Sequence, residues 1–406
     1  MQNNPFRCLF PIFKTNPKLV YFDNAATSLK PQKVIDELTR FYNTNGLNTK
    51  SFGVLTNQNT LLINETRIKT ANFINAKPEE IIFTKGTTDS LNILSQNLGE
   101  TLQEGDEIIT SELEHNSSVL PWIKQAKLKK AKLIFVPLNE QNQITVENFA
   151  KVLTSKTKIV VLTHVSNLLG YETPIKEITT LAHQKNILVI LDAAQSSSHL
   201  PIDVKFLDVD FLAFSSHKLY GPFGIGILFG KNHLLEQLQP TLFGGVSIKE
   251  FSLKHFLLNE VPNKFESGTP NISGILAFKK ALEFVEEIGF ENIQKHEKKI
   301  YQNIMKELKQ IPNITIYNPQ NFSNIITFNF NQIHAHDAEV FLSQENIYVR
   351  TGRCCAFLAT QKIKQTSIIR VSIGIHNNQE DVGILIKNLK KTQTFFSKFN
   401  INKSRH

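Results

Sequence analysis

Seven short apolar segments recur along residues 81–230, separated by polar or glycine-containing stretches. Several are continuous apolar runs, which are typical of strands buried on both faces. Helix-like stretches lie between most of them, which predicts an α/β fold with a seven-stranded, mostly parallel sheet. The last two segments are joined too closely for a crossover helix, which favours an antiparallel pair. The segments are 81–83, 107–110, 132–138, 158–165, 187–194, 211–216 and 224–230.

The pattern changes on either side of this region. Upstream, residues 31–44 predict an amphipathic helix that starts at Pro31. Its apolar face carries Val34, Ile35, Leu38, Phe41 and Tyr42. Downstream, long helices are expected at 272–289, 291–310 and from 379, a shorter helix at 337–344, and strands at 324–330, 346–350 and 368–374.

These flanking elements predict a second, smaller domain of the α+β class. The glycine and proline of the ESGTPN stretch mark its boundary with the sheet region. We therefore predict a large domain over residues 20–268. The small domain would combine residues 1–19 with residues 269–406.

Composition narrows the class of protein. The 406 residues are 41% hydrophobic and 20% charged, which excludes a disordered chain, a collagen-like chain and a disulfide scaffold. No apolar run approaches the ~18 residues of a membrane helix, and no signal layout opens the chain, so we expect a cytoplasmic protein without a membrane partner. Three cysteines suit a reducing compartment. The net charge of +9 comes from scattered lysines, which favours solvated helix faces over nucleic-acid binding.

Polar side chains follow five of the predicted strands, at the edge where ligands bind in α/β sheets. A glycine and two threonines follow the first strand, in a turn that offers N–H groups to an anion but also describes an ordinary helix cap. Asp192 ends one strand, and Lys218 lies 26 residues later at the end of another. This pair suggests a bound heteroaromatic aldehyde, whose ring nitrogen Asp192 would stabilise and whose carbonyl Lys218 would bind as a Schiff base. The other strand-end residues are Thr87, Thr88, His115, Asn167, Gln195, Ser215 and His217.

Several motifs together resemble the cysteine desulfurases, which are pyridoxal 5'-phosphate (PLP) enzymes of the class V aminotransferase family with fold type I. The resemblance spans about residues 20–390, and the RTG-x-x-C loop is similar to the Suf-type branch. It implies conversion of L-cysteine to L-alanine, with a persulfide left on the enzyme for iron–sulfur cluster assembly or other sulfur transfer. It also implies a homodimer and a sulfur-acceptor protein of the Suf system. The motifs are YFDNAATSLKP, FTKGTTDSLN, SSHKLYGP, FESGTPN and VRTGRCCA.

The resemblance assigns the cofactor contacts. Lys218 would form the Schiff base and move the Cα proton, while Asp192 would pair with the pyridinium nitrogen. Gln195 would bond the ring hydroxyl oxygen, and His115 would stack on the ring and assist proton transfer. Asn167 would lie beside cofactor and substrate. The phosphate would be held by Thr87, Thr88, Ser215 and His217, with Thr269 reaching the phosphate of the neighbouring subunit.

The resemblance also assigns the substrate contacts. Cys355 would be the nucleophile that captures sulfur, which requires its thiolate form. Arg370 would bind the substrate carboxylate, since a guanidinium fork matches a carboxylate well. Arg350 would position the substrate and the thiol loop, and Arg350 and Arg353 would favour the thiolate. No metal site is expected.

Three positions depart from the family pattern. Cys354 stands where the branch often has histidine. It would resolve the persulfide, replace the nucleophile or have no role, and we favour a bystander or backup role. Adjacent cysteines make a strained disulfide ring and lack zinc spacing. Within residues 48–56 only Lys50 is basic, whereas relatives carry a histidine and an arginine there. His376 replaces a common tyrosine, and we assign it no role.

Other functions fit parts of the pattern. Selenocysteine lyase activity is the nearest alternative, because both substrates suit one pocket. Other class V reactions, such as epimerisation or transamination, have no use for a loop thiol. A sulfur or metal carrier would use Cys354 and Cys355 without a cofactor. A nicotinamide-dependent dehydrogenase lacks support, since no G-x-G-x-x-G follows the first strand.

Overall fold

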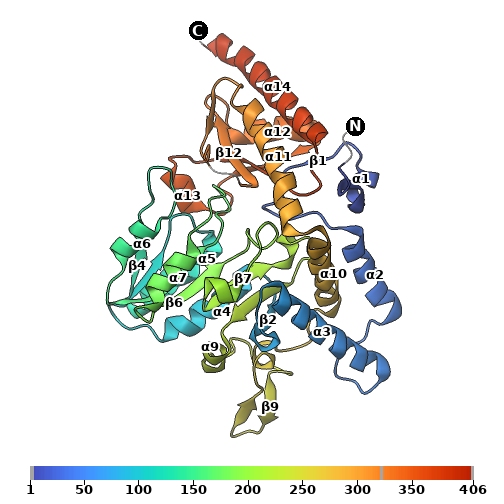
Figure 1. The fold of residues 1–406 in the computed structure, drawn as a ribbon, viewed down its shortest axis with the longest axis vertical. Coiled ribbons are helices and arrows are strands. Elements are labelled where there is room, and N and C mark those ends of the chain that lie inside the picture. Colours follow the sequence, from blue (N-terminus) through green and yellow to red (C-terminus); the bar gives the residue numbers. More distant parts are fainter. Residues whose placement is uncertain (1–3, 321–322, 404–406) are drawn as a thin grey trace.

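The computed structural model describes residues 4–320 and 323–403, and a seven-stranded sheet lies at its centre (Figure 1). The strand order is β2-β8-β7-β6-β5-β3-β4. All neighbours are parallel except β8, which runs antiparallel to both β7 and β2. The predicted α/β fold, its seven-stranded sheet and its antiparallel last pair are therefore confirmed. The strands are β2 (Ile81–Thr84), β3 (Glu107–Thr110), β4 (Lys132–Phe135), β5 (Thr157–Thr163), β6 (Leu188–Asp192), β7 (Phe211–Ser215) and β8 (Gly226–Gly230).

Helices cover both faces of this sheet, which explains the continuous apolar runs. Neighbouring residues Ile108 and Ile109 are both fully buried, but they point into different core clusters on opposite faces. One cluster includes Trp122 and lies under α4 (Thr87–Glu100) and α5 (Asn116–Lys129). The other face is covered by α6 (Val146–Val152), α7 (Ile175–His183) and a group of three further helices.

Three further helices pack together on the second face. These are α2 (Gln32–Thr44), α3 (Val54–Phe73) and α10 (Ile272–Ile288), and α10 contacts both of the others. The predicted helix over 31–44 is confirmed to within one residue. Tyr42, which was expected on the apolar face of this helix, is 69% exposed, and its hydroxyl accepts a hydrogen bond from Ser273 on α10.

A smaller antiparallel sheet lies above the large one in Figure 1, in the order β11-β12-β15-β14. It has its own core cluster with the helices α11, α12 and α14. Since α10 lies beyond residue 268 and packs against α2 and α3, the domain limits stay a prediction. The elements are β11 (Ile314–Ile316), β12 (Ile325–Phe330), β14 (Arg350–Gly352), β15 (Ile368–Ser372), α11 (Phe290–Leu308), α12 (Ala335–Gln344) and α14 (Gln379–Lys403).

Two smaller elements differ from the sequence expectation. The strand expected over 346–350 is divided, because β13 (Ile347–Tyr348) pairs in parallel with β1 (Val20–Tyr21) while β14 joins the small sheet. A hairpin of β9 (Ile248–Phe251) and β10 (Phe256–Leu258) projects from the far end of the molecule (Figure 1). None of the helices within the described residues is long and apolar enough to cross a membrane.

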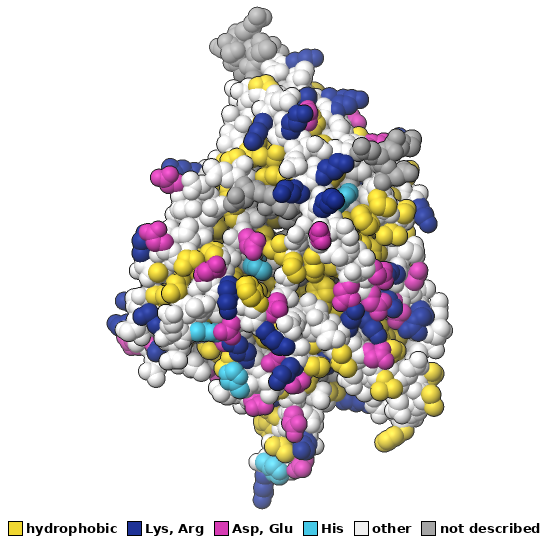
Figure 2. Space-filling view, viewed as in Figure 1, with side chains coloured by type: hydrophobic (Ala, Val, Ile, Leu, Met, Phe, Trp, Pro, Cys, Tyr) yellow, Lys and Arg dark blue, Asp and Glu magenta, His cyan; other side chains and the backbone are white. Residues whose placement is uncertain are grey.

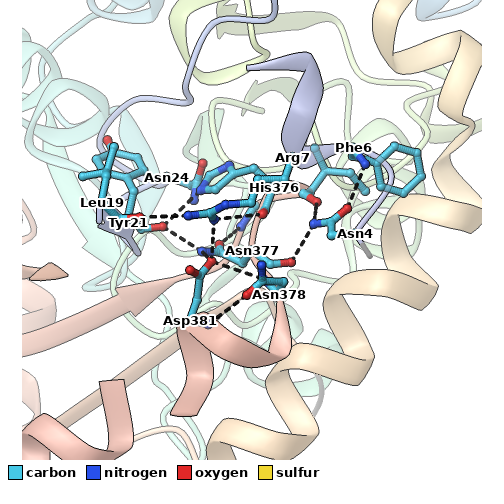
Figure 3. Close-up of polar contacts among 12 residues, drawn as sticks. Asn4, Phe6, Arg7, Leu19, Tyr21, Asn24, His376, Asn377, Asn378 and Asp381 are labelled. Atoms are coloured by element: carbon cyan, nitrogen blue, oxygen red, sulfur yellow. Dashed lines mark hydrogen bonds and ion pairs between the residues drawn. The ribbon is translucent and has the colours of Figure 1, made fainter. Parts of the chain in front are cut away.

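The N-terminal segment is held against the start of α14 by a polar network (Figure 3). Arg7 donates from Nη1 to Asp381 Oδ2 and from Nη2 to the Leu19 carbonyl, both at 2.9 Å. The Asn4 amide donates to two carbonyls of the 375–377 segment. His376 is fully buried there and donates from Nε2 to the Tyr21 carbonyl at 3.1 Å, and burial lowers its pKa to about 3. His376 is therefore a neutral core histidine.

Arg7 is the charged partner of a buried carboxylate, so its loss should destabilise the fold. The Asp381 side chain is 3% exposed, and burial raises its pKa against the opposing effect of Arg7. We expect Arg7→Met to lower the free energy of unfolding by about 3 kcal/mol, because an unpaired buried charge remains. Urea unfolding followed by circular dichroism measures this. Lys33→Met is the matched control and should cost less than about 1 kcal/mol, since its partner Glu287 is 61% exposed. Equal losses in both variants would contradict the prediction.

Candidate active site

A cavity of about 240 Å³ opens at the carboxyl edge of the large sheet, where the loop after β14 comes over it. Twelve of the thirteen residues that the sequence assigned to the site line this cavity. The exception is Thr269, which is exposed on the surface. The twelve are Thr87, Thr88, His115, Asn167, Asp192, Gln195, Ser215, His217, Lys218, Arg350, Cys355 and Arg370.

One end of the cavity is an anion-binding arrangement at the N-terminus of α4. The Thr87 backbone N–H donates to Ser215 Oγ at 2.8 Å, and the two hydroxyls lie 2.7 Å apart. Backbone packing makes this possible: a Cβ on Gly226 would lie 2.4 Å from Gly86 Cα. The glycine pair therefore brings the start of α4 directly onto β8 and next to the end of β7. Hydroxyls and free helix N–H groups at such a site suit a phosphate.

Asp192 places a buried carboxyl group at the end of β6. It is 3% exposed, and it accepts hydrogen bonds from Ser118 Oγ at 2.5 Å and from the Ala194 N–H at 3.0 Å. The nearby Glu114 is fully buried, and burial raises its pKa to about 8. Glu114 is consequently neutral at pH 7.

Lys218 lies in the single turn η3 (Ser216–Lys218) directly after β7. Burial lowers its pKa, while Asp192 and Cys355 act in the opposite direction. The shift favours the neutral amine, which is the nucleophilic form of lysine. His115 caps the N-terminus of α5, and its Nδ1 accepts from the Ser117 N–H. Burial lowers the pKa of His115 to about 4, so a neutral imidazole with its proton on Nε2 faces the cavity.

Arg370 is a buried cation that joins the two sheets. It extends from β15, is 2% exposed, and donates to the Asn167 carbonyl at 2.9 Å and to Asp23 Oδ1 at 3.0 Å. Within the described part of the chain, its Nε and the Asn167 Oδ1 have no hydrogen-bond partner. Both are buried polar atoms whose hydrogen-bonding capacity is not used within the described residues. Gln195 donates its amide to the Ala25 carbonyl at 2.8 Å, which fixes its orientation.

The two adjacent cysteines occupy different environments. Cys354 is 8% exposed, and burial raises its pKa, whereas Cys355 is exposed. Both have left-handed backbone angles, with φ of 49° and 53°. The Cys354 carbonyl accepts from the Asn167 amide, and the Cys355 carbonyl accepts from the Asn116 N–H, both at 2.8 Å. Arg353 lies with its guanidinium 4.6 Å from the Phe357 ring centroid and is not among the residues lining the cavity.

Sequence reasoning missed several residues in and around this site, and three of them share one stretch. Glu114, Ser117 and Ser118 were passed over, although all lie in the SELEHNSSVLPW stretch around the predicted His115. The signal available was the density of polar residues directly after a buried strand. Among the described residues, no group of three or more His, Cys, Asp and Glu side chains is arranged to hold a metal ion.

Comparison with known proteins places this geometry in a family. The family model described as Aminotransferase class-V matches residues 20–385. A protein of Halalkalibacterium halodurans, named a probable cysteine desulfurase, is 39% identical and aligns over 98% of this chain and 99% of its own length. A cysteine desulfurase of Escherichia coli is 38% identical over 92% of this chain and 93% of its own.

Solved structures agree with the sequence comparison. The cysteine desulfurase CsdA of Escherichia coli superposes with a TM-score of 0.91 at 32% identity, covering 97% of this chain and 99% of that one. The apo cysteine desulfurase of Thermococcus onnurineus gives a TM-score of 0.92 at 33% identity, covering 95% and 97%. Since the family model matches all but the two ends of the sequence, the chain belongs to the class V aminotransferase family.

Proposed function

We propose that the protein is a PLP-dependent cysteine desulfurase, which converts L-cysteine to L-alanine and leaves a persulfide on Cys355. The observation that carries the proposal is that the Lys218 amine and the exposed Cys355 thiol open onto one cavity. A lysine serves any PLP enzyme, but an accessible thiol on the loop above it serves sulfur capture. Relatives named cysteine desulfurases align over nearly the whole chain.

The residues of the cavity fit the cofactor of the family. Thr87, Thr88, Ser215 and His217 would hold the phosphate at the start of α4, which the contact between Gly86 and Gly226 sets against β8. Asp192 would pair with the protonated ring nitrogen. Asn167 Oδ1, which is buried without a partner among the described residues, suits a hydrogen bond to the bound ligand. When bound, PLP supplies an electron sink for the carbanion formed at the substrate Cα.

Side chains of the protein would bind the substrate, transfer its proton and capture its sulfur. Arg370 would bind the substrate carboxylate, using the Nε that has no partner in the described residues, and Arg350 would help to orient it. Lys218, whose lowered pKa favours the free amine, would take the Cα proton. The Cys355 thiolate would attack the substrate sulfur, so that a new S–S bond forms as the Cβ–S bond breaks. The electron pair of the broken Cβ–S bond stays with the substrate carbon, which takes up a proton, so that alanine leaves and the persulfide stays on Cys355.

Cys355 rather than Cys354 suits the role of nucleophile. A thiolate is needed for attack, and burial of Cys354 favours its neutral thiol. Cys355 is exposed, so an acceptor protein can reach a persulfide there. We therefore assign Cys354 the role of a bystander.

We further propose the Suf-type branch, a homodimer and a cytoplasmic location. The RTGRCC loop supports the branch, and a Suf-system protein would accept the sulfur. Exposed apolar side chains support a second subunit: Phe52 and Leu253 have fully accessible surfaces, and the exposed Thr269 would reach the neighbouring phosphate. Positive and negative side chains are interspersed on the face in Figure 2, which supports a partner other than nucleic acid. We also propose a division into two domains between residues 268 and 269, because the seven-stranded and four-stranded sheets are separate.

The activity is tested by supplying L-cysteine to the purified holoenzyme and measuring alanine and sulfide. We expect equal amounts of both products when a thiol reductant is present. Lys218→Ala should lose turnover by more than about a thousandfold and also lose the visible absorption band of the bound cofactor. Turnover of selenocysteine but not of cysteine would favour the lyase alternative, and a wild-type protein without a visible band would contradict both.

The nucleophile is tested by a matched pair of variants. Cys355→Ser should lose more than about 99% of sulfide release, because an alcohol cannot form the persulfide. Cys354→Ser should keep more than about half, since this residue does not react. Mass spectrometry after cysteine treatment should locate an added sulfur on Cys355. The reverse pattern of activities would overturn the assignment.

The phosphate site is tested at the glycine contact. In Gly226→Ala the new methyl group would meet the backbone of Gly86, which cannot move without displacing Thr87. We expect PLP affinity to fall by about tenfold or more, as measured by titrating the visible band. Gly383→Ala is the control, because a Cβ at that helical position meets no atom within 4 Å. Unchanged affinity in Gly226→Ala would rule out this site for the phosphate.

A further inference from the structure

The backbone carbonyl of His217, in the peptide bond that precedes Lys218, accepts hydrogen bonds from an unusual number of donors. The His217 carbonyl accepts from the Ser28 N–H at 3.0 Å, Ser28 Oγ at 3.0 Å, Thr27 Oγ1 at 3.1 Å and Lys30 Nζ at 2.9 Å. A carbonyl oxygen has two lone pairs, so four donors concentrate far more positive potential on this oxygen than an ordinary backbone bond does. All four donors come from residues 27–30, which follow the cavity-lining Ala25 and Ala26.

The same segment also holds the other side of Lys218. Ser28 Oγ accepts a hydrogen bond from the Tyr220 N–H at 2.7 Å. The peptide before residue 218 and the N–H two residues after it are therefore both bound by residues 27–30. The short turn that carries the reactive lysine is fixed from a segment almost 190 residues away in sequence.

Lys30 is the charged member of this segment. Its Nζ donates to the Ser28 carbonyl at 2.6 Å as well as to His217, and it lies 5.1 Å from the centroid of the Phe223 ring. Within the described residues it forms no ion pair with a carboxylate. The His217 ring stacks on the same Phe223, with 5.5 Å between centroids.

The presence of a lysine at this buried position needs a physical explanation, because burying a charged side chain costs free energy. Burial lowers the pKa of Lys30 to about 7, which shows that protein surroundings penalise its charge. A methionine of similar length would fill the space without that penalty. What methionine cannot do is donate to the Ser28 and His217 carbonyls, so the amine is required for those bonds.

We propose that Lys30 is a positioning residue for Lys218: its amine fixes the His217 carbonyl, and with it the turn that aims the Lys218 side chain at the cavity. The proposal rests on the proposed function only in taking Lys218 as the reactive amine. Lys30 touches neither the substrate nor the cofactor in this account. A reacting group displaced by about 1 Å loses roughly a hundredfold in rate, so a loosened turn has a large effect.

The experiment compares Lys30→Met with Lys30→Arg, and uses Lys33→Met as a matched control whose lysine pairs with a glutamate that is 61% exposed. In Lys30→Met we expect kcat for L-cysteine to fall about tenfold while KM changes less than about twofold, since the charge-assisted bonds to the His217 and Ser28 carbonyls are lost and no substrate contact is. Hydroxylamine should release the cofactor from the holoenzyme about tenfold faster, followed by the visible band. Lys30→Arg should recover most of both values, and Lys33→Met should equal the wild type.

Two outcomes would overturn the proposal. One is a Lys30→Met holoenzyme with unchanged kcat and unchanged cofactor release. The other is a fall in melting temperature that accompanies equal losses in Lys30→Met and Lys30→Arg, which would show a packing role. If Lys30→Met does not fold, Ser28→Ala removes two of the turn's bonds without touching the charge and should accelerate cofactor release in the same way. Cofactor release does not depend on cysteine turnover, so a failure of the proposed activity stays distinguishable.

Discussion

The buried guanidinium of Arg370 is the interaction on which the site depends, because it connects the two sheets. A charge that is 2% exposed is tolerated only when it is bonded, and Arg370 is bonded to the Asn167 carbonyl beyond β5 and to Asp23 beyond β1. Burial raises the pKa of Asp23, and Arg370 opposes that rise. With this contact in place, the small sheet lies directly over the carboxyl edge of the large one. The cysteine loop between β14 and β15 is thereby brought above Lys218.

Burial then decides which groups in the cavity are charged. Glu114, His115 and His217 all have pKa values that favour their neutral forms, and Lys218 is shifted in the same direction. Asp192 accepts hydrogen bonds from Ser118 and Ala194, and Arg370 is paired with Asp23. A cavity lined by the Asp192 carboxyl group and by the guanidinium groups of Arg350 and Arg370 suits a ligand that carries a protonated ring nitrogen and a carboxylate. The neutral amine and imidazole between them are free to move protons.

Much of the site could be predicted from the residue types at the strand ends. The rest could not be predicted from local sequence. Asp192 and Lys218 were predictable because parallel strands bring their carboxyl ends to one edge. Cys355 and Arg370 were assigned only through the family resemblance, since no local pattern places a second sheet over the first. Helix α3 was missed because its buried positions include polar residues, such as Asn59, Thr66 and Arg67, which hide the helical period of apolar side chains. Lys30 lay within a quoted motif, but its contact with His217 is visible only in three dimensions.

The cysteine loop shows how strain and long-range contacts combine in this fold. Two consecutive non-glycine residues with left-handed φ each cost on the order of 1 kcal/mol or more. Their carbonyls are bound by Asn167 and Asn116, which both belong to the large-sheet side of the cavity. The reversal of the chain at these residues turns one thiol inward and leaves the next one exposed. The strained loop is therefore stable only while the large sheet lies beneath it, so that the exposed thiol at position 355 is presented where Lys218 and Asp192 already face the cavity.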